Sequence, residues 1–198
     1  MNDAKGCFDR IQHVAAILVL MSYGLEFTPA TTLFSTLQQA EHRIKTGYET
    51  LTPMYGNEEK PIQGSGQGNG FAPTVWGLIS CKMIAMMKLK GHGAKFEAAL
   101  TRKLVSIICC AYVDDSDLPK TAATRTTTGE ELQIPFQEML NRWAGALRAT
   151  GGELAPEKSW CYITDFKWTD DKWEYRTVDE MPGTYTLPDN SGNTHPLK

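Results

Sequence analysis

A run of ten almost entirely apolar residues that ends in two acidic ones constrains the fold more than any other part of this sequence. The run covers residues 104–113, Leu-Val-Ser-Ile-Ile-Cys-Cys-Ala-Tyr-Val, and Asp114 and Asp115 follow it directly. A continuous apolar, β-branched stretch is typical of a strand that is buried on both faces. We therefore expect a central strand that delivers two carboxylates to one edge of a sheet.

Two adjacent carboxylates at the end of a buried strand are costly unless a cation neutralises them. Successive side chains of an extended chain point in opposite directions, so Asp114 or Asp115 can face a site while the other faces away. The alternative is an ordinary solvated Asp-Asp turn. The pair alone does not decide between the two interpretations.

The first half of the sequence predicts two helices and a hairpin. Asp9 suits the N-cap of a helix that ends at Gly24, and a second helix is expected over 28–47, with proline in its first turn. A hairpin is then expected to join 48–54 to 60–62. The glycine-rich segment after it fits neither a helix nor a strand.

The second half predicts helices over 74–90 and from about 136 to 151, followed by a hairpin within 162–176. Another short hairpin is expected in the tail. The mixture of helices and strands indicates an α+β fold. With 198 residues and 41% apolar composition the chain is long enough for one core. One domain over 1–198 is therefore expected, with 168–198 as peripheral hairpins.

Composition narrows the class of protein. The five cysteines lack zinc-site spacing, and reduced, buried thiols are expected. The longest apolar stretch, Val14 to Met21, is much shorter than the ~20 residues of a membrane-spanning helix. No signal-peptide pattern is present, so a soluble, intracellular protein is expected. The net charge of −3 argues against a nucleic-acid partner, because such proteins are more often basic.

Two further features could carry chemistry. Asp3 precedes Phe8 by five residues, at the point where a strand would lead into a helix. The segment 63–70 is rich in glycine and precedes Phe71-Ala72-Pro73 and a helix, so its backbone N–H groups could approach a ligand closely. A flexible surface loop is the alternative, since neither the G-x-G-x-x-G pattern nor Gly-Lys-Ser/Thr is present.

In this order the features resemble motifs A, B, C and D of reverse transcriptases. The Asp-Ala-x-x-x-Phe-Asp-x-Ile form of the first is similar to that of non-LTR (LINE-type) retrotransposons and group II intron relatives. The matching residues, which extend from Asp3 to about Ile163, are Asp3, Ala4, Phe8, Asp9, Gln67, Gly68, Pro73, Tyr112, Val113, Asp114, Asp115, Gly152 and Lys158.

The resemblance implies a polymerase palm, an antiparallel sheet with helices packed on one face, and RNA-directed DNA synthesis within a retroelement. Asp3, Asp114 and Asp115 would hold two Mg²⁺ or Mn²⁺ ions about 4 Å apart for nucleotidyl transfer. Lys158 would protonate the leaving pyrophosphate. The alternative for Lys158 is a solvated surface lysine.

The same resemblance assigns the binding residues. Phe8 would lie under the incoming sugar and exclude a 2′-hydroxyl, and Gln67, Gly68, Pro73 and Tyr112 would contact the template or the nucleotide. The implied partners are an RNA template, a DNA primer and deoxynucleoside triphosphates. No membrane partner is implied.

The sequence departs from the family's pattern in three places. Ala155 stands where motif D usually has asparagine, with Pro156 after it, and residues 116–119 are more polar than usual. The sequence begins at motif A and ends before a recognisable thumb, so fingers and thumb segments of the same polyprotein are expected partners. Two alternatives stay open: the palm of an RNA-dependent RNA polymerase, against which Phe8 counts, and a non-catalytic remnant or interaction module, against which the intact aspartates count.

Overall fold

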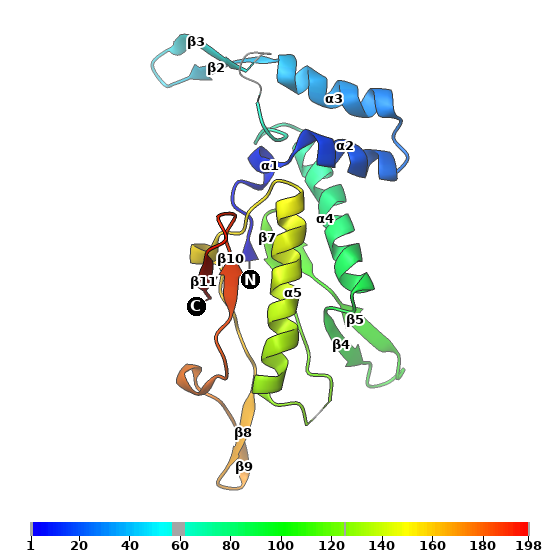
Figure 1. Cartoon of the computed structure of the whole chain (residues 1–198), viewed down its shortest axis with the longest axis vertical. Helices are drawn as coiled ribbons and strands as arrows, with labels where there is room; N and C mark the ends of the chain where they lie inside the picture. The colour runs from blue at the N-terminus through cyan, green and yellow to red at the C-terminus, as the bar shows by residue number, and fades with distance from the viewer. Residues whose placement is uncertain (1, 57–61, 125, 198) are drawn as a thin grey trace. The chain divides into compact units, whose positions relative to one another are not determined.

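The computed structural model describes residues 2–56, 62–124 and 126–197 (Figure 1), which form helices and small antiparallel sheets, as the α+β expectation requires. By its internal contacts the chain divides into two compact units. Unit 1 comprises Met1–Lys5, Met83–Arg148 and Glu153–Lys198, and unit 2 comprises Gly6–Lys82 and Ala149–Gly152. Each unit is described by itself below.

The main sheet of unit 1 has three short strands, β1 (Asn2–Asp3), β6 (Cys110–Tyr112) and β7 (Asp115–Asp117). Their order is β1-β7-β6 and both pairings are antiparallel, with β7 in the centre. The first strand of the chain therefore pairs with a strand that lies far along the sequence. This long-range pairing positions the acidic residues considered below.

Three two-stranded hairpins complete the strands of unit 1. They pair β4 (Ala94–Glu97) with β5 (Leu104–Ile107), β8 (Phe166–Thr169) with β9 (Lys172–Tyr175), and β10 (Thr186–Pro188) with β11 (Thr194–Pro196). Short 3₁₀ turns, η1 (Pro156–Lys158) and η2 (Val178–Glu180), lie between them in the chain. The last two hairpins confirm the expected pairings, although β8 begins later than the sequence suggested.

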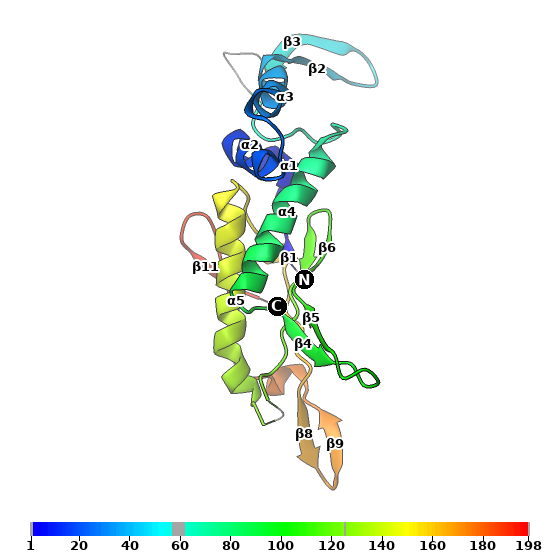
Figure 2. The same cartoon turned by 90° about the vertical axis from the view of Figure 1, so that its right-hand side faces the viewer.

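Helix α5 (Gly129–Ala149) supplies much of the core of unit 1. Its buried face carries the expected apolar stripe, consisting of Met139, Leu140, Trp143, Ala144 and Leu147. The same helix fixes β10, because the Gln137 side-chain amide donates to the Thr186 carbonyl (2.8 Å) and its oxygen accepts from the Thr186 N–H (2.9 Å). The helix therefore stabilises both the core and the tail. Figure 2 shows it on one side of the strands of unit 1.

Unit 2 contains three helices and a hairpin. Their bounds are α1 (Cys7–Arg10), α2 (His13–Ser22), α3 (Phe27–Gln39), β2 (Glu41–Lys45) and β3 (Thr50–Gly56), and α4 (Ala72–Leu89) begins in this unit. Its buried residues come mainly from the helices: Ile11, Ala16, Leu20, Ala30, Phe34, Val75, Trp76 and Ile79. The expected helix after the glycine-rich segment is thus confirmed as α4.

The single helix expected between Asp9 and Gly24 is wrong, because the chain breaks between α1 and α2. Ile11 and Gln12 are extended, and the Gln12 N–H donates to the Thr150 carbonyl (2.8 Å) instead of staying in a helix. Ile11 is almost fully buried at the break. Asp9 therefore lies inside α1 and caps neither helix.

The second helix also ends earlier than expected, at Gln39, since Glu41–Lys45 forms β2 and pairs with β3. The hydroxyl of Thr46 accepts from the N–H of Glu49 (3.1 Å), and the Thr46 N–H donates to the Glu49 carbonyl (2.9 Å). These bonds close a turn at the position that resembled a helix end. The hairpin expected to use residues 60–62 is therefore wrong in its first partner, and 57–61 lie outside the described residues.

The expectation of one buried central strand over 104–113 is also wrong. The stretch divides into β5 and β6, whose residues are all exposed, and Ile108 between them is buried. Among the described strands, β5 pairs only with β4 and β6 only with β7. Each is thus an edge strand, which is why an apolar, β-branched sequence here does not imply burial on both faces.

The cysteines are all free, but their expected burial is only partly correct. Cys7 is buried, whereas Cys81 and Cys110 are exposed and the other two are half-buried. No helix within the described ranges is long and apolar enough to cross a membrane.

Helix α5 provides a test of the core of unit 1. Met139 is fully buried and Ile134, five residues earlier on the same helix, is 76% exposed. Met139→Ala should lower the free energy of unfolding by about 2–5 kcal/mol, because it leaves a cavity. Ile134→Ala, the control, should change it by less than about 1 kcal/mol. Urea unfolding of both variants checks this, and equal effects would contradict the assigned face of α5.

Candidate functional site

The turn between β6 and β7 has an unusual backbone. Tyr112 and Asp115 are paired across the hairpin, so Val113 and Asp114 form a two-residue loop. Val113 has φ 54°, in the left-handed region that a β-branched residue rarely adopts. A positive φ at the first of two loop residues is a position normally given to glycine. Strain of this kind costs about 1–3 kcal/mol and is concentrated at functional sites.

The backbone of Asp3 lies directly beside this turn. Asp3 is the cross-strand partner of Asp115, and the N–H of Ala4 donates to the Asp114 carbonyl (3.2 Å). Opposed Cα atoms of an antiparallel pair are about 4.5–5.5 Å apart. The structure therefore brings together the three acidic positions that the resemblance grouped, at one end of the sheet.

The electrostatic argument for a cation has to be changed. Asp114 and Asp115 are half-buried and β6 is exposed, so burial of a strand no longer supplies it. What remains is the crowding of like charges, since carboxylates within a few ångströms repel each other and a cation relieves the repulsion. The described residues contain no group of three metal-ligating side chains, and the side chain of Asp3 lies outside them.

A thiol near the same sheet is inert at neutral pH. Burial, together with the neighbouring Cys110 and Asp117, raises the pKa of Cys109 to about 12. A thiol with so high a pKa stays protonated and is a poor nucleophile and a poor metal ligand. The chemistry at this end of unit 1 therefore belongs to oxygen and nitrogen groups.

Lys158 lies near the other side of β1. Ala4 forms an isolated bridge with Leu154, the Lys5 N–H donates to the Glu153 carbonyl (2.8 Å), and η1 contacts β1. Lys158 is exposed at the end of η1. The segment that carries the expected lysine thus runs beside the strand that carries Asp3.

The departures at Ala155 and Pro156 have a structural role. Pro156 occupies the start of η1, where a missing N–H costs nothing. The Ala155 carbonyl accepts from the Lys158 N–H (3.0 Å) and from the buried Ser159 hydroxyl (2.9 Å). These residues therefore build the turn that precedes and positions Lys158.

In unit 2 the glycine-rich loop is hydrogen-bonded to α1. The carbonyl of Phe8 accepts from the N–H of Ser65 (2.7 Å) and from its hydroxyl (3.2 Å). Asp9 Oδ1 accepts from the N–H of Gln67 (3.2 Å). Asp9 thus holds the loop, a role that its sequence position did not indicate.

Gly64 is required for this close approach. Its φ is 76°, and a Cβ built on it would lie 2.2 Å from the Phe8 carbonyl oxygen. Gly66 has a similar φ of 74° but open space around it. The first glycine is therefore a packing requirement, whereas the second is required only by its backbone conformation.

The remaining predicted binding residues are accessible. Gln67, Gly68 and Pro73 are exposed, and Pro73 lies in the first turn of α4. Phe8 is half-buried in α1. Tyr112, in unit 1, is 79% exposed. Unit 1 therefore holds the acidic residues, Tyr112 and Lys158, and unit 2 holds Phe8 with the loop.

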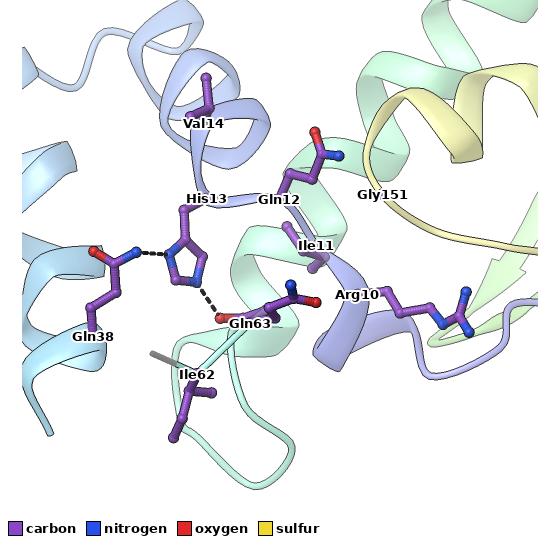
Figure 3. Close-up of a pocket in the computed structure, with 10 residues that line it drawn as sticks. Arg10, Ile11, Gln12, His13, Val14, Gln38, Ile62, Gln63 and Gly151 are labelled. Atoms are coloured by element: carbon purple, nitrogen blue, oxygen red, sulfur yellow. Dashed lines mark hydrogen bonds between the residues drawn. The ribbon is translucent and has the colours of Figure 1, made fainter. Parts of the chain in front are cut away.

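A cavity of about 650 Å³ lies within unit 2 between α1, α2, α3 and the loop (Figure 3). At its wall His13 connects two elements: Nε2 is 2.6 Å from the Gly64 carbonyl oxygen, and Nδ1 is 3.0 Å from Gln38 Nε2. A carbonyl only accepts, so Nε2 donates to it, and Nδ1 accepts from the amide of Gln38. The sequence analysis missed His13, because one histidine near a helix start carries no recognisable pattern.

No known protein family matches the sequence, and no curated protein matches it either. The interpretation of the site therefore depends on its geometry and on the motifs.

Gly64 provides a test of the loop. Gly64→Ala and Gly66→Ala share the cost of a positive φ, about 1 kcal/mol, but only the first also clashes with backbone. Gly64→Ala should lower the free energy of unfolding by at least about 1 kcal/mol more than Gly66→Ala does. Urea unfolding, with amide exchange of Ser65 and Gln67 as a local measurement, checks this. Equal losses would contradict the close approach.

Proposed function

We propose that this chain is the palm of an RNA-directed DNA polymerase of a retroelement. The observation that carries the proposal is the sheet order β1-β7-β6, which sets Asp3 opposite Asp115 and beside the Asp114 turn. The resemblance implied this type of arrangement, carboxylates from distant parts of the sequence at one end of an antiparallel sheet. The sequence motif and the strand register thus agree without depending on each other.

The residues fit a magnesium or manganese site by their chemistry. Carboxylates are the hard oxygen ligands that Mg²⁺ prefers, and Asp3, Asp114 and Asp115 would supply them. When bound, two ions would activate the primer 3′-hydroxyl and stabilise the leaving pyrophosphate. The half-buried positions of Asp114 and Asp115 leave them accessible from solvent. The strained turn at Val113 fixes Asp114 at the tip of the hairpin.

The other residues would bind and orient the substrates. Lys158, exposed beside β1, would donate a proton to the leaving pyrophosphate. Phe8 would restrict the 2′ position of the incoming sugar, and its backbone is fixed by Ser65. Gln67 and Gly68, on the loop that Asp9 holds, would contact the template and the nucleotide.

Metal binding is the first test. With Mg²⁺ at ten times its Kd, the folded chain gains about 1.4 kcal/mol, which raises the Tm by roughly 3–6 °C for a chain of this size. Asp114→Asn should remove this increase. The control is Asp170→Asn, which makes the same charge change at an exposed turn. Differential scanning fluorimetry with and without Mg²⁺ checks this, and an equal response in wild type and Asp114→Asn would contradict the site.

Primer extension is the second test and addresses the reaction itself. On an RNA template with a DNA primer, the chain should add deoxynucleotides in the presence of Mg²⁺ or Mn²⁺, slowly, because a net charge of −3 gives a weak grip on phosphates. Asp114→Asn should abolish the addition and Asp170→Asn should not. Phe8→Val should raise the incorporation of ribonucleotides relative to deoxynucleotides.

The outcomes of this assay separate the alternatives. A wild-type preference for ribonucleotides would indicate an RNA polymerase. Absence of any metal-dependent addition by wild type, at micromolar protein and over hours, would indicate a non-catalytic module.

A further inference from the structure

The β4–β5 hairpin and the turn before it concentrate positive charge in an acidic chain. Between residues 61 and 113 the sequence has six basic residues and one acidic residue, Glu97, although the whole chain has a net charge of −3. The six basic residues are Lys82, Lys88, Lys90, Lys95, Arg102 and Lys103. The charge that attracts phosphates is therefore local, and the net charge of the chain conceals it.

The lysines of this hairpin patch, defined as Lys88, Lys90, Lys95 and Lys103, are not neutralised within the protein. All four are exposed, and none forms an ion pair with a carboxylate in the part of the chain that the structure describes. The one acidic residue nearby, Glu97, pairs with Arg102 (3.1 Å). An external polyanion would relieve the repulsion among the lysines.

The hairpin presents these charges on a hydrogen-bonded support. In its loop the Ala98 N–H donates to the Lys103 carbonyl (2.9 Å), and the Arg102 N–H donates to the Ala98 carbonyl (2.8 Å). The Lys95 N–H donates to the Thr121 hydroxyl (3.0 Å), which joins β4 to the segment that carries Lys120. Burial, and then the charge of Lys95, lowers the pKa of Lys120, so another amine lies close to the patch.

The patch and the acidic turn belong to the same unit and lie at two ends of one stretch of chain. Figure 2 shows β4–β5 extending from the end of β5–β6 that is opposite to the β6–β7 turn. The stretch from Lys103 to Asp114 spans at most about 36–40 Å, from ~3.3–3.6 Å per residue. A nucleic-acid helix with a rise of ~3.4 Å per base pair covers this distance in roughly 11 base pairs.

We propose that the hairpin patch binds the sugar-phosphate backbone of a nucleic acid, independently of base sequence. The charge pattern indicates a polyanion, and the choice of nucleic acid rests on the proposed function. The lysines are distributed over a helix end, a turn, β4 and the start of β5, which suits repeated phosphates along a strand. The patch would then supply the phosphate grip that the net charge denies to the rest of the chain.

The test measures binding without catalysis. Fluorescence anisotropy would follow the 198-residue chain on a labelled 20-base-pair duplex and a 20-nucleotide single strand, in EDTA, over a range of NaCl concentrations. The patch variant is Lys90→Gln, Lys95→Gln, Lys103→Gln. The control variant is Arg43→Gln, Lys45→Gln, Lys172→Gln, which removes the same charge at exposed positions outside the patch. Circular dichroism melting shows that both variants fold.

The patch variant should bind at least about tenfold more weakly at low salt, and the slope of log K against log[NaCl] should fall by roughly 2–3 on the duplex, from ~0.9 per phosphate contact. The control variant should stay within about threefold of wild type. Equal losses in both variants, or no binding by wild type at low salt, would overturn the proposal.

A further arm separates nucleic acid from a lipid surface, for which the exposed Leu100 and Leu104 at the hairpin would be suited. Vesicles of phosphatidylcholine with phosphatidylserine replace the oligonucleotide. If the patch variant loses only vesicle binding, the proposal is wrong. Asp114→Asn should bind the duplex as wild type does, so loss of polymerase activity and loss of this binding are independent results.

Discussion

The pairing of β1 with β7 is the interaction on which the proposed chemistry depends. Two residues at the start of the chain complete a sheet with a strand more than a hundred residues later, and their register sets Asp3 against Asp115. The adjoining backbone bonds of Ala4 and Lys5 then hold the strand between the acidic turn and the segment that leads to Lys158. Without this pairing, the carboxylates would belong to unrelated parts of the chain.

Local patterns predicted elements well where the decisive contacts were also local. The apolar stripe of α5 and the helix after Pro73 follow from helical spacing, and the β8–β9 turn follows from polar residues between aromatic strands. The grouping of Asp3 with Asp114 and Asp115 came from the resemblance, because no local property of Asp3 specifies its strand partner.

The errors occurred where distant backbone contacts overrode local preference. A hydrogen bond to Thr150 breaks the helix at Gln12, and pairing with β3 turns the end of a helical pattern into β2. The apolar run over 104–113 has the composition of a buried strand, yet its two halves are edge strands with exposed side chains. Hydrophobic composition records a preference for burial, and whether other elements cover the strand depends on the remainder of the fold.

The pairing of β1 with β7 also has a consequence for synthesis on the ribosome. At roughly 5–20 residues per second, β7 emerges about 6–22 s after β1 has been made. During this interval Asn2 and Asp3 have no strand to pair with, whereas the helices of unit 2 can already form. The first strand to be made is therefore among the last to be placed, and a chain that stalls before residue 117 would retain its helices without any part of the acidic site.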